Sequence, residues 1–559
     1  MEYKRVEYDK YAAESGGLLA SFHAAPSAEA QLAAAKHIFA LQDRYLTMST
    51  LSYIRHTVNT ADPFYSAEND YYDENGPRFE SLRVDFLKAL TGSPHRTALE
   101  KTLGSLLFSN AQMALHAFDN RIIDDMAEEN RLQSRYTKLI ASAQIDFGGK
   151  KNNLSQLGYF MNSGDRQTRR EAYRARTAFF MAHAQELDEI YDSLVKVRDR
   201  MAKKLGFRDF VELGYLRMTR NSYTPEDIAA FRRQVVEKIV PLTQEIYEKQ
   251  RRRLGVDELM FYDEKVLFAD GNPLPEGTPD EIFENGKRMY HEMSPETGEF
   301  IDFMLQNELF DVLGRANKAA GGYCTLLPDF RSPFIFANFN GTHDDIGVLT
   351  HEAGHAFEYY LARNVYPPAY RDTTADAAEI HSMSMEFFCW PWTKLFFGKN
   401  AEKYHYLHLT EALSFIPYGC AVDEFQHRVY ENPGMTPEER KQTWTKLEKI
   451  YLPHLRFGDD PFFGKGGTWQ RQLHIYEYPF YYIDYCLAQT CALEFWSLSL
   501  KDRGAAWQKY LRYSGFAGAK TFSGLLEAAG LHSPLKSGTL DEIAAAAKEW
   551  FDHFDESVL

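Results

Sequence analysis

Residues 344–390 read DDIGVLTHEAGHAFEYYLARNVYPPAYRDTTADAAEIHSMSMEFFCW, and this stretch predicts two consecutive helices. Asp344 can cap a first helix, and Pro367 stops it. Thr374 can cap a second helix, which Pro391 ends. Because each predicted helix carries histidine and carboxylate side chains, the pair is the first place to look for a functional site.

The first helix contains the motif His351-Glu352-Ala353-Gly354-His355. Four residues correspond to about 400° of helical rotation, so His351 and His355 lie on one face and can reach a single ion. Two histidines at this spacing are typical of a zinc site. Glu352 lies about 100° further round the helix, where a carboxylate can act as general base on a water at the metal. With 18 histidines in 559 residues the motif can also arise by chance, so a third ligand is required.

The third ligand is sought among the nearby acidic residues. Glu358 is rejected, because ligands at i, i+4 and i+7 are spread along about 10 Å of one helix. The second helix offers Asp376, Glu379, His381 and Glu386, of which Glu379 is the candidate. Glu386 lies seven residues after Glu379 and hence on the same face, where it could orient a ligand histidine.

Elsewhere the apolar residues recur at the spacing typical of amphipathic helices, and stretches typical of strands are few. The predicted helical stretches are 29–57, 98–143, 167–205 and 225–254, and the predicted strands are 259–268 (LMFYDEKVLF) and 333–339 (PFIFANF). We expect a mainly α, large helical protein with a small β-sheet beside a deep substrate cleft or channel. Its 559 residues should form an N-terminal helical lobe (1–200) and a catalytic lobe (201–559).

Composition excludes some classes of partner and predicts a cellular location. Sixty-three Lys and Arg against 79 Asp and Glu give a net charge of −16, which argues against nucleic acid or an anionic membrane as a partner. The N-terminus lacks the apolar stretch of a signal peptide, and no apolar run is long enough to span a bilayer, so a cytoplasmic location is expected. Five cysteines without a CxxC pair predict buried free thiols.

Several segments together carry a family resemblance. GVLTHEAGHAFEYY (347–360) is followed by AAEIHSMSMEFF (377–388), with GGYC (321–324) and PFIFANFNGTHDD (333–345) upstream and HIYEYPFYYIDY (474–485) downstream. In this order they resemble the M3 family of zinc metallopeptidases, in particular its oligoendopeptidase F-like branch. The resemblance implies a zincin-type fold whose enclosed channel admits short unfolded peptides.

The resemblance also implies roles for individual residues. His351, His355 and Glu379 would bind one zinc ion per chain, and Glu352 would be the general base. His474, Tyr482 and Tyr485 would hold the substrate carbonyl and its developing oxyanion. The choice of tyrosines stays open, because others crowd the same stretch: Tyr476, Tyr478 and Tyr481.

The leading hypothesis is a zinc-dependent endopeptidase that hydrolyses internal bonds of oligopeptides. An extended peptide could pair with the segment Pro333–Phe339 if that segment is an edge strand. A zinc exopeptidase of the dipeptidyl carboxypeptidase type is an alternative, and it would need a cationic group to capture a terminal carboxylate. A non-catalytic peptide-binding protein is a third possibility, disfavoured because Glu352 and the three ligands are all present.

Overall fold

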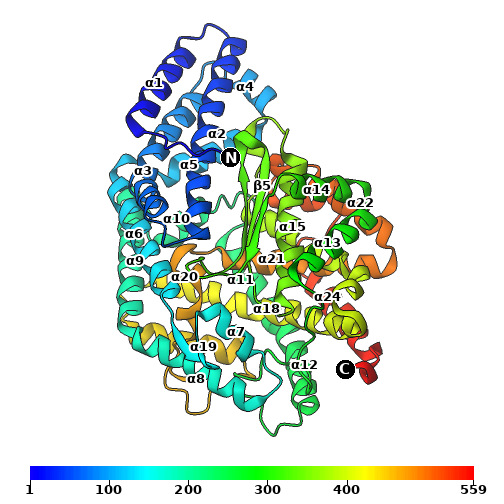
Figure 1. The fold of residues 1–559 in the computed structure, drawn as a ribbon. Coiled ribbons are helices and arrows are strands. Elements are labelled where there is room, and N and C mark those ends of the chain that lie inside the picture. Colours follow the sequence, from blue (N-terminus) through cyan, green and yellow to red (C-terminus); the bar gives the residue numbers. More distant parts are fainter.

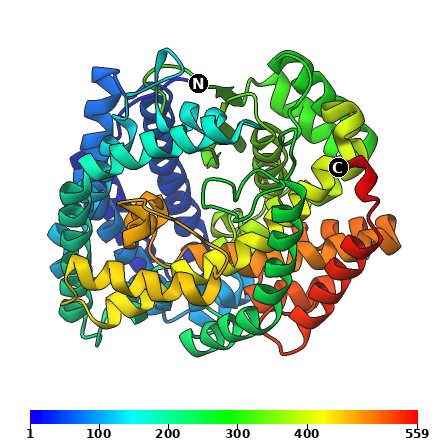
Figure 2. The same ribbon diagram turned by 90° about the horizontal axis from the view of Figure 1, so that it is seen from below.

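A computed structural model describes residues 1–559, most of which are helical, as predicted (Figure 1). The helices are α1 (Tyr8–Ala24), α2 (Ala28–Val58), α3 (Pro63–Thr91), α4 (Arg96–Leu103), α5 (Ser105–Ala117), α6 (Ile123–Ala141), α7 (Leu154–Met161), α8 (Arg166–Ala182), α9 (Ala184–Leu205), α10 (Phe210–Arg217), α11 (Pro225–Gln234), α12 (Val240–Arg253), α13 (Pro279–Met293), α14 (Pro295–Gln306), α15 (Asp344–Ala362), α16 (Ala375–Phe388), α17 (Lys394–Phe397), α18 (Ala401–Glu431), α19 (Pro437–Tyr451), α20 (Leu473–Glu477), α21 (Tyr482–Lys501), α22 (Arg503–Ser514), α23 (Phe522–Ala529) and α24 (Thr539–His553). The N-terminal helices (blue) and the C-terminal helix α24 (red) lie on opposite sides of the molecule in both views (Figures 1 and 2).

The predicted helical stretches contain helices, but three of the four are interrupted. The first corresponds to α2, whose start is capped by Ser27 accepting from the Ala30 amide at 3.3 Å. The stretch 98–143 is split between α4 and α5, because Gly104 adopts φ +86°, a conformation that favours glycine and cannot continue a helix. The stretch 225–254 contains the π-helical turn Val235–Ile239 between α11 and α12.

The sheets are small. β1 (Ile145–Phe147) pairs with β2 (Lys150–Asn152), and a second sheet has the order β3-β5-β4. β5 (Ser332–Phe339) runs parallel to β3 (Phe310–Leu313) and antiparallel to β4 (Tyr323–Leu327). The expectation that Pro333–Phe339 is an edge strand is therefore wrong, because both of its sides are paired within the sheet. The edge strands of this sheet are β3 and β4.

The predicted strand at 259–268 is also wrong, since this segment consists of turns. Its backbone is satisfied by a side chain instead of a neighbouring strand. The amide of Gln250 in α12 donates to the carbonyl oxygens of Asp263, Glu264 and Val266 at 3.1, 3.0 and 2.9 Å. This buried amide thus binds three carbonyl groups that a strand partner would otherwise bind.

The apolar core has one large part and smaller satellites. The large cluster of 103 buried residues extends along the chain from Ile122 to Phe551. A separate cluster of 14 comprises residues between Phe22 and Ala111 together with Tyr370. Apart from Tyr370, the sequence boundary between the two clusters lies between Ala111 and Ile122. Residue 200, the predicted boundary between the lobes, lies inside α9. The division into 1–200 and 201–559 stays a prediction.

None of the helices is both long and apolar enough to cross a bilayer.

All five cysteines are free, and four of them are buried, whereas Cys324 is half-buried.

Candidate metal centre

The two motif histidines lie on α15, which follows the central strand β5. The prediction that Asp344 caps this helix is wrong, because the N-cap residue is His343 and no side chain caps the helix. The next residue, Asp345, fixes the chain before the helix. Its carboxylate accepts from the backbone amides of Asn340 and Gly341, both at 2.8 Å, and so holds the loop between β5 and α15. The rings of His351 and His355 lie one turn apart on the same face, with centroids 5.1 Å apart.

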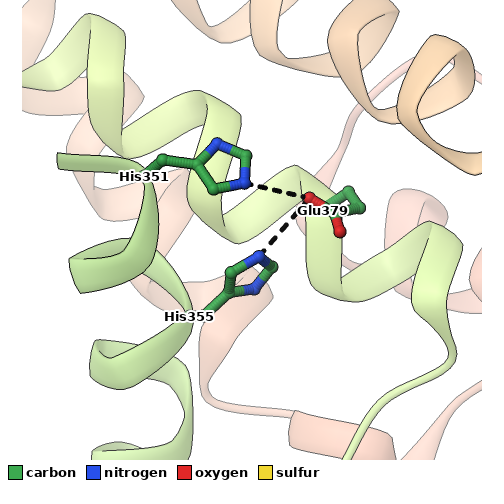
Figure 3. Close-up of side chains that lie close together, drawn as sticks. All are labelled: His351, His355 and Glu379. Carbon is green, nitrogen blue, oxygen red and sulfur yellow. Dashed lines mark ion pairs between the residues drawn. The ribbon is translucent and has the colours of Figure 1, made fainter. Parts of the chain in front are cut away.

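Glu379 of α16 faces both histidines, as Figure 3 shows. Its Oε2 lies 3.3 Å from Nε2 of His351 and 3.4 Å from Nε2 of His355. Donor atoms of these three residues all lie within 4.8 Å of one another. Around a tetrahedral zinc ion with bonds of about 2.0–2.2 Å, neighbouring ligand atoms are about 3.4 Å apart. Two imidazole nitrogens and one carboxylate oxygen at these separations therefore fit a zinc ion with a further position free for water or substrate.

Gly354 explains how α16 can come so close to α15. A Cβ atom at this position would lie 2.5 Å from Cα of Ser382 and 2.7 Å from the carbonyl oxygen of His381. Any larger residue would push the two helices apart, and Glu379 with them. The glycine inside HEAGH is thus the sequence signal for a close neighbouring helix.

Glu386 holds the outer nitrogen of His351. Its Oε1 lies 2.7 Å from Nδ1 of His351, and its Oε2 lies 2.7 Å from Nε2 of His408. Burial would raise the pKa of Glu386, but the two histidines lower it to about 2, so the carboxylate is charged. A charged acceptor at Nδ1 keeps the proton there and leaves Nε2 of His351 as the free donor atom.

Glu352 is the residue next to the first histidine, and it is 7% exposed. Burial raises the pKa of its carboxyl group, and the two histidines counteract this shift. The Gly321–Gly322 stretch lies beside it, since a Cβ at Gly322 would be 3.5 Å from Oε1 of Glu352. A partly desolvated carboxylate with a raised pKa has the properties of a general base.

The other candidates on these two helices face elsewhere. Asp376 accepts from the hydroxyl of Tyr223 at 2.8 Å, and Nδ1 of His381 lies 3.1 Å from the hydroxyl of Ser514. Glu358 is fully buried, and neither of its carboxyl oxygens has a hydrogen-bond partner. Burial raises its pKa well above the usual value, which favours the neutral form of this carboxyl group in the core.

A second set of predicted residues lies on α20 and α21. His474 is joined to Tyr485 by a 3.2 Å contact between Nε2 and the hydroxyl, and Gln472 Nε2 lies 2.9 Å from its Nδ1. Burial lowers the pKa of His474 to about 4, so the ring is neutral. With Nδ1 accepting from Gln472, the remaining proton sits on Nε2 and points at Tyr485.

Tyr481, which the resemblance left among the alternatives, makes the direct contact with the metal group. Its hydroxyl donates to Oε1 of Glu379. The ring of Tyr482 instead packs against Phe415 at 5.4 Å and Tyr418 at 5.7 Å, both on α18. Adjacent residues at the start of a helix point about 100° apart, so only one of the two can face Glu379.

Arg220, from the loop after α10, fixes this tyrosine segment to α16, and no sequence pattern indicated it. Its guanidinium donates to the carbonyl oxygen of Phe480, which has φ +68°, and to Asp484 at 2.8 Å. Tyr223 of the same loop donates to Asp376, one turn before Glu379. The loop therefore connects the backbone next to Tyr481 with the helix that carries Glu379.

Comparisons with known proteins identify the family of this chain. Residues 159–537 match the family profile of Peptidase family M3, and residues 1–118 match the Peptidase M3 N-terminal domain. The chain is 48% identical to PZ peptidase A, solved with an inhibitor, over 99% of each chain, with a TM-score of 0.98. A protein from Bacillus anthracis str. Ames, provisionally named oligoendopeptidase F, is 45% identical over 100% of this chain and 98% of its own, with a TM-score of 0.94. Oligopeptidase PepF of Bacillus subtilis (strain 168) is 21% identical over 92% of this chain and 79% of its own.

Proposed function

Because this chain belongs to peptidase family M3, whose members are peptide-hydrolysing metalloenzymes, we propose that it is a zinc-dependent endopeptidase of short unfolded peptides. The observation that carries the proposal is the group of His351, His355 and Glu379, with its 3.3 and 3.4 Å separations and with Glu352 beside it. Both histidines and the carboxylate would hold one zinc ion per chain. Cobalt or manganese also accept nitrogen and oxygen ligands.

A bound zinc ion would polarise the scissile carbonyl and make a water molecule acidic enough to attack at neutral pH. Glu352 would accept the proton of the attacking water and return it to the departing amine. Its burial supports this role, because a raised pKa brings the carboxyl group closer to the working pH. Glu386 would keep Nε2 of His351 turned toward the ion.

His474 and the tyrosines would stabilise the oxyanion that forms when water adds to the carbonyl. A neutral imidazole and a phenol are both hydrogen-bond donors, and one such donor contributes roughly 3 kcal/mol. Tyr485 is in contact with His474, and either Tyr481 or Tyr482 would complete the set. The contact with Glu379 favours Tyr481.

The decisive experiment uses an internally quenched peptide with both ends blocked. Wild type should cleave it, whereas chelator-treated protein and the Glu352→Gln variant should lose activity by about 10²–10⁴-fold. Metal content measured on the Glu352→Gln variant should stay at the wild-type level. Cleavage that persists in this variant would refute the mechanism. Cleavage of peptides with free ends alone would favour the exopeptidase alternative.

A further inference from the structure

A row of hydrogen bonds runs from helix α18 to the tyrosine segment. The hydroxyl of Tyr418 donates to Oε1 of Gln472 at 2.8 Å. Nε2 of Gln472 lies 2.9 Å from Nδ1 of His474, and Nε2 of His474 lies 3.2 Å from the hydroxyl of Tyr485. We refer to these four residues as the polar chain. Its two tyrosines lie on different helices, α18 and α21, and Gln472 directly precedes α20.

The backbone around Gln472 is held in place. Its N–H donates to the carbonyl oxygen of Trp469 at 2.9 Å, and its carbonyl oxygen accepts from the N–H of Ile475 at 3.1 Å. Helix α18 also packs against the far end of the polar chain, since the ring of Phe415 lies 6.0 Å from that of Tyr485. The tyrosine that starts the polar chain is on the same helix, about one turn further along. Both ends of the polar chain are therefore in contact with α18.

The amide of Gln472 gives the polar chain a direction, because its oxygen only accepts and its nitrogen only donates. The hydroxyl of Tyr418 has no other hydrogen-bond partner within the protein, so its proton goes to the amide oxygen. With the amide reversed, this hydroxyl proton would have no acceptor in the protein. The amide nitrogen consequently faces His474 and donates to its Nδ1.

His474 continues the same direction. Burial lowers the pKa of the ring to about 4, with Glu379 as the charged group that opposes this shift, so the imidazole carries one proton. The ring is otherwise surrounded by aromatic rings, with centroids at 6.2, 5.6, 5.0 and 5.5 Å: Tyr478, Tyr481, Tyr482 and Tyr485. Because Nδ1 accepts from the amide, the proton is on Nε2 and is donated to the oxygen of Tyr485.

The proton of Tyr485 is left free at the end of the polar chain. Its hydroxyl has no further hydrogen-bond partner within the protein. The ring of Tyr485 lies 4.9 Å from that of Tyr481, whose hydroxyl donates to Glu379. The free proton is therefore close to the metal group. In a row of hydrogen bonds that all point the same way, each bond polarises the next, so the last donor is strengthened.

We propose that Gln472 is a positioning residue, which orients the polar chain so that Tyr485 presents its phenolic proton to the oxyanion. The inference rests on the proposed function, since the oxyanion arises only when a peptide carbonyl is attacked. Gln472 does not touch the substrate and acts through His474. Without its amide, the imidazole proton could move to Nδ1, and Nε2 would then accept the proton of Tyr485. The amide thus decides whether the phenol donates to the substrate or to the histidine.

The tautomer of His474 tests the direction of the polar chain without any substrate. Nitrogen NMR on zinc-loaded protein with ¹⁵N-labelled histidine reports which ring nitrogen carries the proton, and the signals lost in His474→Ala identify this ring. Wild type should show a protonated Nε2 and an unprotonated Nδ1. A proton on Nδ1 in wild type would overturn the proposal. Absence of peptide cleavage would instead refute the proposed function, and the tautomer would still be measured.

Gln472→Glu tests the effect of the direction on catalysis. An ionised carboxylate only accepts, so the proton of His474 must face it and the polar chain reverses, whereas the protonated acid can still donate as the amide does. On the blocked peptide, the ratio of wild-type kcat to variant kcat should rise with pH to about 10–100-fold, with KM changed by less than about threefold. A ratio that is the same at every pH would overturn the proposal.

A second background separates positioning from a general disturbance of α20. In His474→Ala, the further change Gln472→Glu should alter kcat by less than about threefold, because its effect passes through the imidazole. Equal losses in both backgrounds would overturn the proposal.

Tyr418→Phe removes only the first hydrogen bond of the polar chain and should lower kcat by about two- to fivefold. Tyr406→Phe is the matched control, since Tyr406 lies on the same helix and its hydroxyl accepts from Arg253 at 2.8 Å. It is twelve residues from Tyr418, or about 18 Å along the helix. This control should keep the wild-type kcat. An equal loss in both variants would contradict the role of Tyr418 in the polar chain.

Discussion

The metal group (His351, His355 and Glu379) and the pair of His474 and Tyr485 differ in charge. In the metal group two imidazoles face one carboxylate, and the carboxylate of Glu386 contacts Nδ1 of His351. In the pair, the imidazole of His474 is neutral, because burial lowers its pKa to about 4, and its Nε2 lies 3.2 Å from the hydroxyl of Tyr485. The first group offers ligand atoms to a cation, and the second offers hydrogen-bond donors to an anion. We therefore expect the metal group to hold the metal and the pair to donate hydrogen bonds to the substrate carbonyl.

The largest expected effect comes from removing a ligand of the metal group. Glu379→Ala should weaken metal binding by roughly two to three powers of ten, because a binding free energy of about 10–16 kcal/mol is shared among few ligands. His351→Ala should behave similarly. Metal analysis after dialysis against a graded chelator measures the effect. Full metal content with unchanged affinity in Glu379→Ala would show that the third ligand is another residue.

The tyrosine that faces the metal group should matter far more than its neighbour. Tyr481→Phe removes the hydroxyl that donates to Glu379 and should lower kcat by about 100-fold if this donor also reaches the oxyanion. Tyr482→Phe should change kcat by less than about threefold, because its ring packs against α18. Steady-state kinetics on one peptide compares the two variants. The reverse order would assign the role to Tyr482.

Glu386→Gln tests the contact between the Glu386 carboxylate and Nδ1 of His351. The amide can still contact Nδ1, but it lacks the charge that fixes the proton there, so metal affinity should fall by about 10–100-fold. Glu358→Gln is the control, because Glu358 lies on the same helix as the histidines and its raised pKa favours the neutral form. The control should bind metal as wild type does. Equal losses in both variants would point to a general disturbance of the helices.

The smallest effect is expected on stability, at His343, whose Nε2 lies 3.4 Å from Asp344 and 3.3 Å from Glu411. Burial lowers the pKa of His343, but Glu411 and Asp344 raise it to about 9, above the unfolded value of about 6.5. Its stabilising contribution is therefore complete below pH 6.5 and is lost as the pH rises through 9. His343→Gln should cost on the order of 1–3 kcal/mol at pH 6 and much less at pH 9.5. Thermal melting at both pH values measures the difference, and a cost independent of pH would contradict it.

The metal group could be predicted from the sequence to a large extent. The spacing of His351 and His355 places them on one face of any helix. Glu379 lies about one turn after Thr374, the predicted cap of the second helix. The structure brings donor atoms of the three within 4.8 Å. The glycine at 354 was available as a signal for close helix packing, but only the structure shows that a Cβ atom there would lie 2.5 Å from Cα of Ser382.

Other features could not be predicted. The pairing of β5 on both sides depends on β3 and β4, which a strand pattern alone does not locate. The choice between Tyr481 and Tyr482 depends on the rotation of α21, and Arg220 helps to set that rotation from outside the segment. These features result from contacts between elements that are distant along the chain.

The sequence by itself determined the helical character and the residues of the metal-binding face, because hydrogen bonds between neighbouring residues set the helical period. Tertiary structure alone decided that Arg220 pairs with Asp484 and that the hydroxyl of Tyr481 reaches Glu379. Ion pairing depends on which side chains come within a few ångströms of each other. Packing of the whole chain sets those distances, and no local pattern records them.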